Sequence, residues 1–299
     1  MQLVAQVGLR GWDARVEGDG VADDSTGHSE IGGGGAELRQ DRPHSARMYD
    51  YYLGGKTNYA VDREAAEEVT RHFPGIGAAA RVNRAFMHRS ARYLAGHCGI
   101  RQFIDIGTGI PTAPNLHEVA QEAAPDARVV YVDNDPIVLV YADELLNSSS
   151  QGATAYVEGD VTDPGSVLAA VEESGCLDLE RPVGLSLHAL LHFVPDDRDP
   201  YGIVRTLLDR LAPGSYLSLS HCTPDFDPVA WAGIVEVYHS AGTAAQVRSR
   251  AEVLRFFDGL TLADPGLVVA HRWRPQAASG PSLVTDAQVS LYAGVAQKA

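Results

Sequence analysis

Three short apolar segments, each with an aspartate at or near its end, constrain the fold more than any other feature of this chain. The segments are RQFIDIG, ARVVYVDND and ATAYVEGD, and their acids are Asp105, Asp133 and Asp160. Between them lie two helical patterns, NLHEVAQEA and PIVLVYADELL. Strands that alternate with helices in this way predict an α/β fold with a parallel, doubly wound sheet.

Further strands are expected downstream of this region. They lie near PVGLSLHAL, SYLSLSH, LVVAHRW and VSLYAGVA, and helices are expected around YGIVRTLLDRL and AEVLRFFDG. Asp225 and Asp227, in TPDFDP, are expected to form a turn. The sequence therefore predicts seven strands, of which the last two follow each other with only a polar loop between them.

The chain divides into three predicted regions. Residues 1–42 are rich in Gly, Asp and Ser and predict a disordered leader, because they carry too few large apolar side chains to offset ordering entropy. Residues 43–100 predict a helical cover, with helices from Pro43 to Gly54-Gly55, over 62–72 and over 78–97. Residues 101–299 carry the sheet pattern.

Composition excludes several classes of partner. The chain has 39 acidic residues against 24 Lys plus Arg, a formal charge of −15, and no basic cluster, which argues against nucleic acid and against an anionic membrane surface. Three dispersed cysteines without a C-x-x-C pair indicate neither a disulfide framework nor a zinc site. No signal peptide or membrane span is recognisable, so the expected location is the cytoplasm.

The loop after the first strand contains Gly107 and Gly109, in IDIGTGIPT. A tight turn and the close approach of a ligand both favour residues without a Cβ at such a place. A dinucleotide fingerprint needs a third glycine where Thr112 stands, so a nicotinamide or flavin cofactor is disfavoured.

The three acids favour a different ligand. Carboxyl ends of adjacent parallel strands face one crevice, where three carboxylates would repel a pyrophosphate and attract a cation. S-adenosylmethionine is cationic and carries no phosphate; Asp133 is placed to accept from its ribose hydroxyls and Asp160 from its adenine amine. The alternative is that each Asp only caps a helix or forms a turn.

Taken together, these segments resemble the class I S-adenosylmethionine-dependent methyltransferases. More narrowly, residues 43–299 resemble an actinobacterial family of S-adenosyl methyltransferases first catalogued as a domain of unknown function. The resemblance is carried by RMYDYYLGGKTNYAVDREAAEEV, RVNRAFMHRSARYLA, RQFIDIGTGIPTAPNLHEVAQ, DARVVYVDNDP, LHFVPDD, LAPGSYLSLSH and RSRAEVLRFFDGL. It implies a Rossmann-like sheet whose last strand is antiparallel.

The resemblance also implies roles for particular residues. Asp105 and the loop from Gly107 through Thr108 to Gly109 would face the methionine part of the cofactor. The ribose site would be Asp133 with Asn134, and the adenine site would be Asp160 with Val161. His188, just after the fourth strand, would lie near the cofactor, and it departs from the small or apolar residue that is usual there.

Two histidines are candidate bases for the methyl acceptor. His192, in LHFVPDD, and His221, at the end of the fifth strand, are expected at the same sheet edge and titrate near neutral pH when unperturbed. The alternative is a packing role for His192 and a capping or loop role for His221.

The acceptor itself is expected to be a small molecule. The (D/N/S)-P-P-(Y/F/W) signature of methyltransferases acting on nucleic-acid or glutamine amines is absent after the fourth strand. Two other hypotheses remain open, a non-catalytic S-adenosylmethionine-binding sensor or partner protein, and a nucleotide-sugar or nicotinamide enzyme on a related fold. Either a monomer or a homodimer is compatible with the sequence.

The stretch ARMYDYYLGGKTNYAVD before the sheet is a candidate wall of the site. Arg47 is expected to meet the cofactor carboxylate, and Tyr49, Tyr52 or Asn58 to face the sulfonium or the acceptor. The alternative is an ordinary surface helix followed by a turn.

Overall fold

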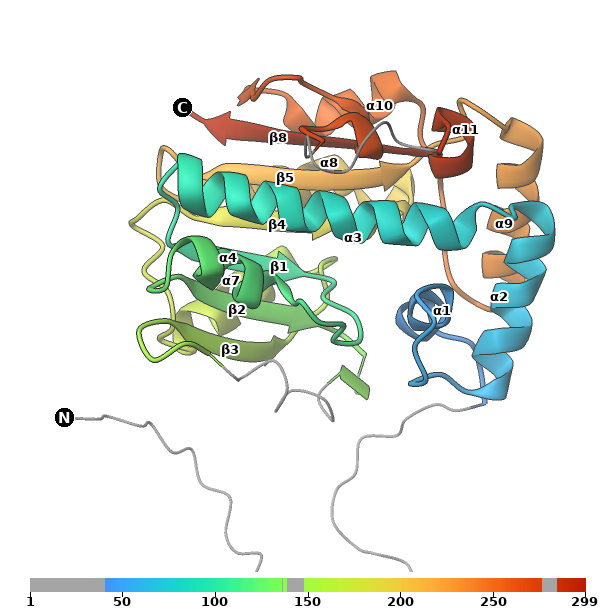
Figure 1. Cartoon of the computed structure of the whole chain (residues 1–299), viewed down its shortest axis with the longest axis horizontal. Helices are drawn as coiled ribbons and strands as arrows, with labels where there is room; N and C mark the ends of the chain where they lie inside the picture. The colour runs from blue at the N-terminus through green and yellow to red at the C-terminus, as the bar shows by residue number, and fades with distance from the viewer. Residues whose placement is uncertain (1–40, 136, 139–147, 276–283) are drawn as a thin grey trace, which may run out of the picture. The chain divides into compact units, whose positions relative to one another are not determined.

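The computed structural model describes residues 41–135, 137–138, 148–275 and 284–299 (Figure 1). Nearly all of the predicted leader and most of the helix expected over 136–146 lie outside the described residues. The described residues belong to one unit, Glu37–Ala299.

A single sheet organises this unit. Its strand order is β3-β2-β1-β4-β5-β8-β6, and the short β7 also pairs with β8. The strands are β1 Gln102–Ile106, β2 Arg128–Asp133, β3 Ala153–Glu158, β4 Gly184–His188, β5 Tyr216–Cys222, β6 Leu260–Leu262, β7 Val268–Val269 and β8 Leu291–Lys298. Strands β1 to β5 are mutually parallel, whereas β8 runs antiparallel to β5, β6 and β7. The predicted Rossmann-like, mostly parallel sheet is therefore confirmed.

The predicted number and position of the late strands need correction. The described residues form eight strands rather than seven. The strand expected over 267–273 shrinks to Val268–Val269, because a 3₁₀ turn, Ala270–Arg272, follows at once. The edge strand is instead β6, Leu260–Leu262, which directly follows the predicted AEVLRFFDG helix.

Helices cover the sheet and one end of it. They are α1 Ser45–Tyr52, α2 Ala60–His72, α3 Ile76–Arg92, α4 Leu116–Ala123, α7 Pro164–Glu173, α8 Pro200–Arg210, α9 Pro228–Ser240, α10 Arg250–Leu254 and α11 Asp286–Val289. The long α3 crosses the face of the sheet that carries α4, and α7 contacts α8 behind it (Figure 1). Among the described helices, none is long and apolar enough to cross a membrane.

Besides the four-residue α11, two of these helices, α7 and α9, are absent from the sequence prediction. Each begins at an aspartate whose side chain accepts a backbone N–H, followed by proline at the first helical position. In α9 the cap is Asp227, which accepts from Ala230 N at 3.0 Å, and the next residue is Pro228. The TPDFDP segment, predicted to be a turn, is therefore a helix start as well.

The apolar side chains form two separate clusters. The larger one surrounds the sheet and includes Phe103, Ile104 and Val130. The smaller one, which we call the cover core, joins α1, α2, α3 and α9 and is composed of Met48, Tyr52, Ala66, Val69, Phe73, Ala79, Ala80, Trp231, Ile234, Tyr238 and Ala245. Helix α9 thus completes a second hydrophobic core that the predicted three-helix cover lacks.

A buried acid fixes α1 against α2. Asp62 is fully buried and accepts hydrogen bonds from His44 N at 2.9 Å, Arg47 Nε at 3.1 Å and Tyr59 N at 2.8 Å. A carboxylate with three such donors positions the start of α1 and the cap of α2 at once.

Candidate functional site

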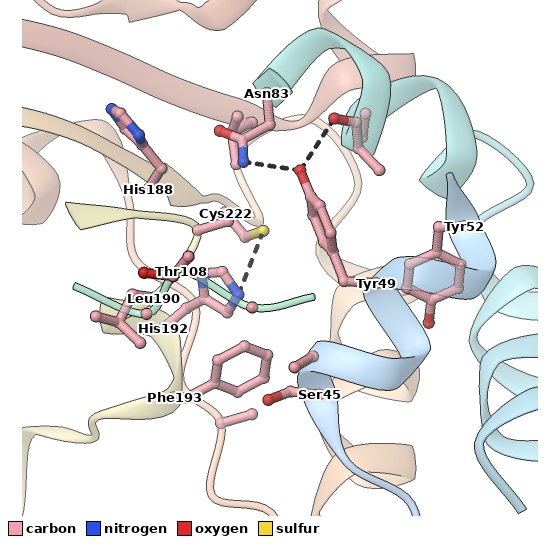
Figure 2. A pocket seen from close by; sticks show the side chains of 18 of the residues that line it. Ser45, Tyr49, Tyr52, Asn83, Thr108, His188, Leu190, His192, Phe193 and Cys222 are labelled. Atoms are coloured by element: carbon pink, nitrogen blue, oxygen red, sulfur yellow. Dashed lines mark hydrogen bonds between the residues drawn. The ribbon is translucent and has the colours of Figure 1, made fainter. Parts of the chain in front are cut away.

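A large cavity opens at the carboxyl edge of the sheet. One end is lined by residues at or after the ends of β1 to β4, among them Asp105, Gly107, Asp133 and Val161. The other end, which we call the aromatic chamber, is walled by Tyr49, Tyr52, Phe193, Trp231, Ile234 and Tyr238. Figure 2 shows Tyr49 of α1 opposite His192 and Phe193 of the loop after β4, with Thr108 of the glycine loop nearby. The cavity thus lies at the carboxyl ends of the neighbouring strands β1 and β4, and α1 and α9 cover it.

The glycine loop has a backbone shape that requires glycine. Gly107 and Gly109 have φ angles of 74° and 65°, in the left-handed region. A Cβ on Gly107 would also lie 2.7 Å from Leu190 Cδ1. The Gly107 N–H donates to Val132 O at 2.8 Å, which holds the loop against β2. The loop is thus shaped for close approach of a ligand to its backbone.

Asp133 lies at the end of β2 and is 6% exposed. Its carboxylate accepts Gly109 N at 2.7 Å and Asp135 N at 2.9 Å, so it ties the glycine loop to the start of the next segment. Asp135 in turn lies 2.9 Å from His44 Nδ1, just before α1. Burial raises the pKa of Asp133, while these two N–H groups act to lower it.

Asp105 and Arg84 bring opposite charges to the same end of the cavity. Arg84, on α3, lines the cavity and donates to Thr112 O and Pro114 O beyond the glycine loop. Burial raises the pKa of Asp105 to about 7; the Arg84 cation opposes this rise and the Asp133 carboxylate adds to it. A zwitterionic amino-acid group would meet a partner for each of its charges here.

The raised pKa of Asp105 predicts a pH dependence of stability. The folded state binds this proton more tightly than the unfolded state, whose Asp pKa is about 3.9, so the free energy of unfolding falls as pH rises between about 4 and about 7. Between about pH 5 and about pH 7, the free energy of unfolding of wild type should fall by about 1 to 2 kcal/mol more than that of Asp105→Asn, as measured by urea unfolding. Parallel profiles of the two proteins would contradict this assignment.

The expected adenine edge is only partly as predicted. Asn134 and Val161 line the cavity, but the Asp160 side chain does not. Asp160 is exposed and accepts Thr162 N and Oγ1, each at 2.8 Å, and Asn134 Nδ2 at 3.3 Å. Thr162 holds the Asp160 carboxylate at the rim of the cavity. The expectation of a third carboxylate inside the pocket is therefore corrected.

Two of the histidines that line the cavity are neutral. They are His188 and His192, and burial lowers the pKa of each to about 3. His188 Nε2 lies 2.8 Å from Ser218 Oγ, and His192 Nε2 lies 4.0 Å from Cys222 Sγ. Burial therefore argues against His192 as a base that titrates near neutral pH.

His221 lies away from the cavity and is fully buried. Its Nε2 is 2.9 Å from Arg248 Nη1 and its Nδ1 is 2.7 Å from Cys222 O. Burial, with His192 and Arg248 nearby, lowers its pKa well below the usual value. The expectation that His221 reaches the reacting groups is corrected to a packing role beside Arg248.

Two of the predicted wall residues of α1, Arg47 and Tyr49, point in different directions. Tyr49 lines the cavity, where its hydroxyl donates to Ala80 O and accepts Asn83 Nδ2, both at 3.0 Å (Figure 2). Arg47 is 2% exposed, does not line the cavity, and is bound by Asp62 and by Arg42 O. Arg47 is therefore corrected from a cofactor contact to a buried tie between α1 and α2.

Several cavity residues are missing from the sequence interpretation. They are Asn83 and Arg84 of α3 and the α9 residues Trp231, Ile234 and Tyr238. Arg84 is the α3 arginine in the described cavity lining, and it contacts the segment beyond the glycine loop. Arg89, on the same helix, donates to Trp273 O and Ala270 O, each at 2.7 Å.

Comparison with known proteins places this geometry in a family. A family model described as S-adenosyl methyltransferase matches residues 33–299. The chain belongs to the S-adenosyl methyltransferase family. It is similar to a DUF574 family protein from Streptomyces avermitilis, with 47% identity, 88% of this chain and 100% of that chain covered, and a TM-score of 0.85. None of the curated proteins compared with this chain matches it.

A second solved structure supports the same assignment. It is a candidate methyltransferase from Thermobifida fusca, with 37% identity, 87% of this chain and 97% of that chain covered, and a TM-score of 0.80. The protein is thus an S-adenosylmethionine-dependent methyltransferase. Its cavity fits that cofactor, because a glycine loop in which a Cβ at Gly107 would meet Leu190 adjoins the buried Asp133 carboxyl, the partly buried Asp105 carboxyl and the Arg84 cation.

Proposed function

We propose that this methyltransferase modifies a small molecule held in the aromatic chamber. The observation that carries the proposal is the continuity of one cavity from Asp105 and Asp133 to Trp231 and Tyr238. S-adenosylmethionine supplies the activated methyl group when it is bound at the first end. A small acceptor in the second end would lie next to that group, which is what in-line transfer needs.

Particular residues would hold the cofactor. Asp133 would accept hydrogen bonds from the ribose hydroxyls, since its oxygens already face the glycine loop. Asp105 would pair with the ammonium and Arg84 with the carboxylate, because they bring opposite charges to one end. Val161 and Asn134 would flank the adenine, with Asp160 orienting Asn134 from the rim.

The described residues that line the cavity around the chamber offer the acceptor no strong base. Burial lowers the pKa of His192 to about 3, which makes its neutral imidazole a weak base, and raises the pKa of Tyr49 and Cys222 to about 12, so both keep their protons. The residues around the acceptor would bind and orient it and exclude water. This favours an acceptor oxygen or nitrogen that is nucleophilic without help from a side-chain base.

The dispersed cysteines bear on where the enzyme works. Cys98, Cys176 and Cys222 are all free thiols. Free, partly buried thiols suit a reducing compartment. We therefore propose that the enzyme works in the cytoplasm.

Calorimetry with S-adenosylhomocysteine tests the assignment of the cofactor end. Asp133→Asn should weaken binding by about 10- to 100-fold, because charged hydrogen bonds of this kind contribute about 1.5 to 3 kcal/mol. Asp258→Asn, at an exposed aspartate outside the cavity, is the matched control and should bind as wild type does. Equal affinity of Asp133→Asn and wild type would refute the placement.

A further inference from the structure

The two ends of the cavity differ in charge. Every ionisable Asp or Arg in the described lining, namely Arg84, Asp105 and Asp133, lies at the cofactor end, and His44 lies there also. Among the described residues that wall the aromatic chamber there is no Asp, Glu, Lys or Arg. A charged group entering the chamber would lose its hydration without gaining a partner, which is costly.

The walls of the chamber are mainly aromatic rings. Phe193 and Tyr238 contact edge to face, with ring centroids 5.2 Å apart, and Trp231 packs on Phe73 at 5.7 Å. Tyr49 and Tyr52 face them from α1. Flat aromatic surfaces arranged around a space favour a ligand that is itself a planar ring.

Three buried polar atoms in the lining of the chamber lack hydrogen-bond partners among the described residues. They are Trp231 Nε1, His192 Nδ1 and the Tyr52 hydroxyl oxygen, in side chains that are 3%, 8% and 8% exposed. The indole nitrogen can only donate. His192 Nδ1 donates or accepts according to the tautomer of the ring, so the Trp231 indole is the atom with a fixed donor role. A buried donor without a partner is unfavourable until a ligand supplies an acceptor.

We propose that the methyl acceptor is an uncharged planar ring compound that presents a carbonyl oxygen or ring nitrogen to Trp231 Nε1. This inference rests on the proposed function, since it names the substrate class of the same site. The ring packs between α1 and α9, its acceptor atom binds the indole N–H, and its nucleophilic atom points towards the cofactor end.

Binding of matched probes to the full-length chain tests the proposal. Coumarin and coumarin carboxylate, and chromone and chromone carboxylate, are titrated calorimetrically, each with and without S-adenosylhomocysteine. The neutral member of each pair should bind at least about tenfold more tightly, because its carboxylate counterpart finds no cation in the chamber. Equal or reversed affinities within the pairs, or no binding of either neutral probe, would overturn the proposal.

A substitution tests the hydrogen bond separately. Trp231→Phe keeps an aromatic wall but removes the donor, and should weaken coumarin and chromone by about tenfold. Trp273→Phe is the matched control, because Trp273 Nε1 is also buried without a partner among the described residues but lies outside the cavity lining. Unchanged coumarin affinity in Trp231→Phe would overturn the assigned contact, and the probe pairs on wild type decide the substrate class even if this variant does not fold.

The two proposals fail in distinguishable ways. Absence of S-adenosylhomocysteine binding, with the neutral probes still preferred, would refute the cofactor placement and support the chamber assignment. Intact S-adenosylhomocysteine binding with carboxylates preferred would refute only the substrate class.

Discussion

Asp62→Ala should lower the free energy of unfolding by about 3 to 5 kcal/mol, the largest loss of stability that we expect from a single substitution. Asp62 accepts three hydrogen bonds at the junction of α1 and α2, and one of the donors is the buried Arg47 guanidinium. Removing the carboxylate takes away the buried counter-charge of that cation. Urea unfolding followed by circular dichroism measures the change.

The control for this prediction lies on the same helix. Glu64 is exposed on α2, so Glu64→Ala should change stability by no more than about 0.5 kcal/mol. A loss below about 1 kcal/mol in Asp62→Ala would mean that the ion pair does not hold the cover in place. Because α1 walls the aromatic chamber, the destabilised variant should also bind neutral ring probes more weakly.

Gly107→Ala should reduce S-adenosylhomocysteine affinity by about 100-fold, the largest effect that we expect on binding from the glycine loop. The φ angle of 74° is unfavourable for alanine by about 1 to 2 kcal/mol, and the added Cβ would lie 2.7 Å from Leu190 Cδ1. Relieving the contact requires the Leu190 side chain or the glycine loop to shift, and a shifted loop no longer presents its backbone to the cofactor. Calorimetry measures affinity and thermal melting measures stability.

Two further variants separate backbone strain from the steric contact. Gly175 has a φ angle of 63°, and a Cβ added there would have nothing within 4 Å, so Gly175→Ala should lose stability but keep its affinity. Adding Leu190→Ala to Gly107→Ala should recover part of the lost affinity, because it removes the atoms that the new methyl meets. If the double variant recovers no affinity, the unfavourable φ angle alone causes the loss of affinity in Gly107→Ala.

The fold is largely predictable from the sequence because its signals are local. Runs such as ARVVYVD and ATAYVEGD are short, β-branched and separated by helix-length segments, and they form β2 and β3. The unpredicted helices α7 and α9 also carry a local signal, an Asp-Pro pair in which the aspartate caps and the proline occupies the first turn. The Asp227-Pro228 pair is equally typical of a turn. Interpreting the segment only as a turn therefore misses α9, the helix that follows.

Side-chain direction explains most errors at the site. Arg47 and Tyr49 are two positions apart on a helix, which places them on nearly opposite faces, so they could not both face the cavity. Likewise Ser220 of β5 donates to Asn83 towards the cavity at 2.6 Å, and the next residue, His221, must point to the other face of the sheet. The residue type suggests a possible role. The periodicity of the helix or strand determines whether that side chain faces the cavity.

Burial accounts for what sequence could not supply. The pKa of His192 falls to about 3 and that of Asp105 rises to about 7 because neighbouring elements remove water from both. The elements responsible, α3 and the loops around β4 and β5, are distant in sequence from one another. A sequence pattern predicts that such residues meet at the edge of the sheet, but it does not predict how far they are shielded from water.

The separate cover core has a consequence for how this enzyme can be altered. Trp231, Ile234 and Tyr238 belong to that small cluster and not to the large one around the sheet. Libraries that vary these three positions would therefore redesign the chamber wall while leaving the strands and the glycine loop unmutated. On the proposed function, such libraries would alter the acceptor side of the cavity and keep the cofactor side, which makes the protein a scaffold for selecting new acceptors.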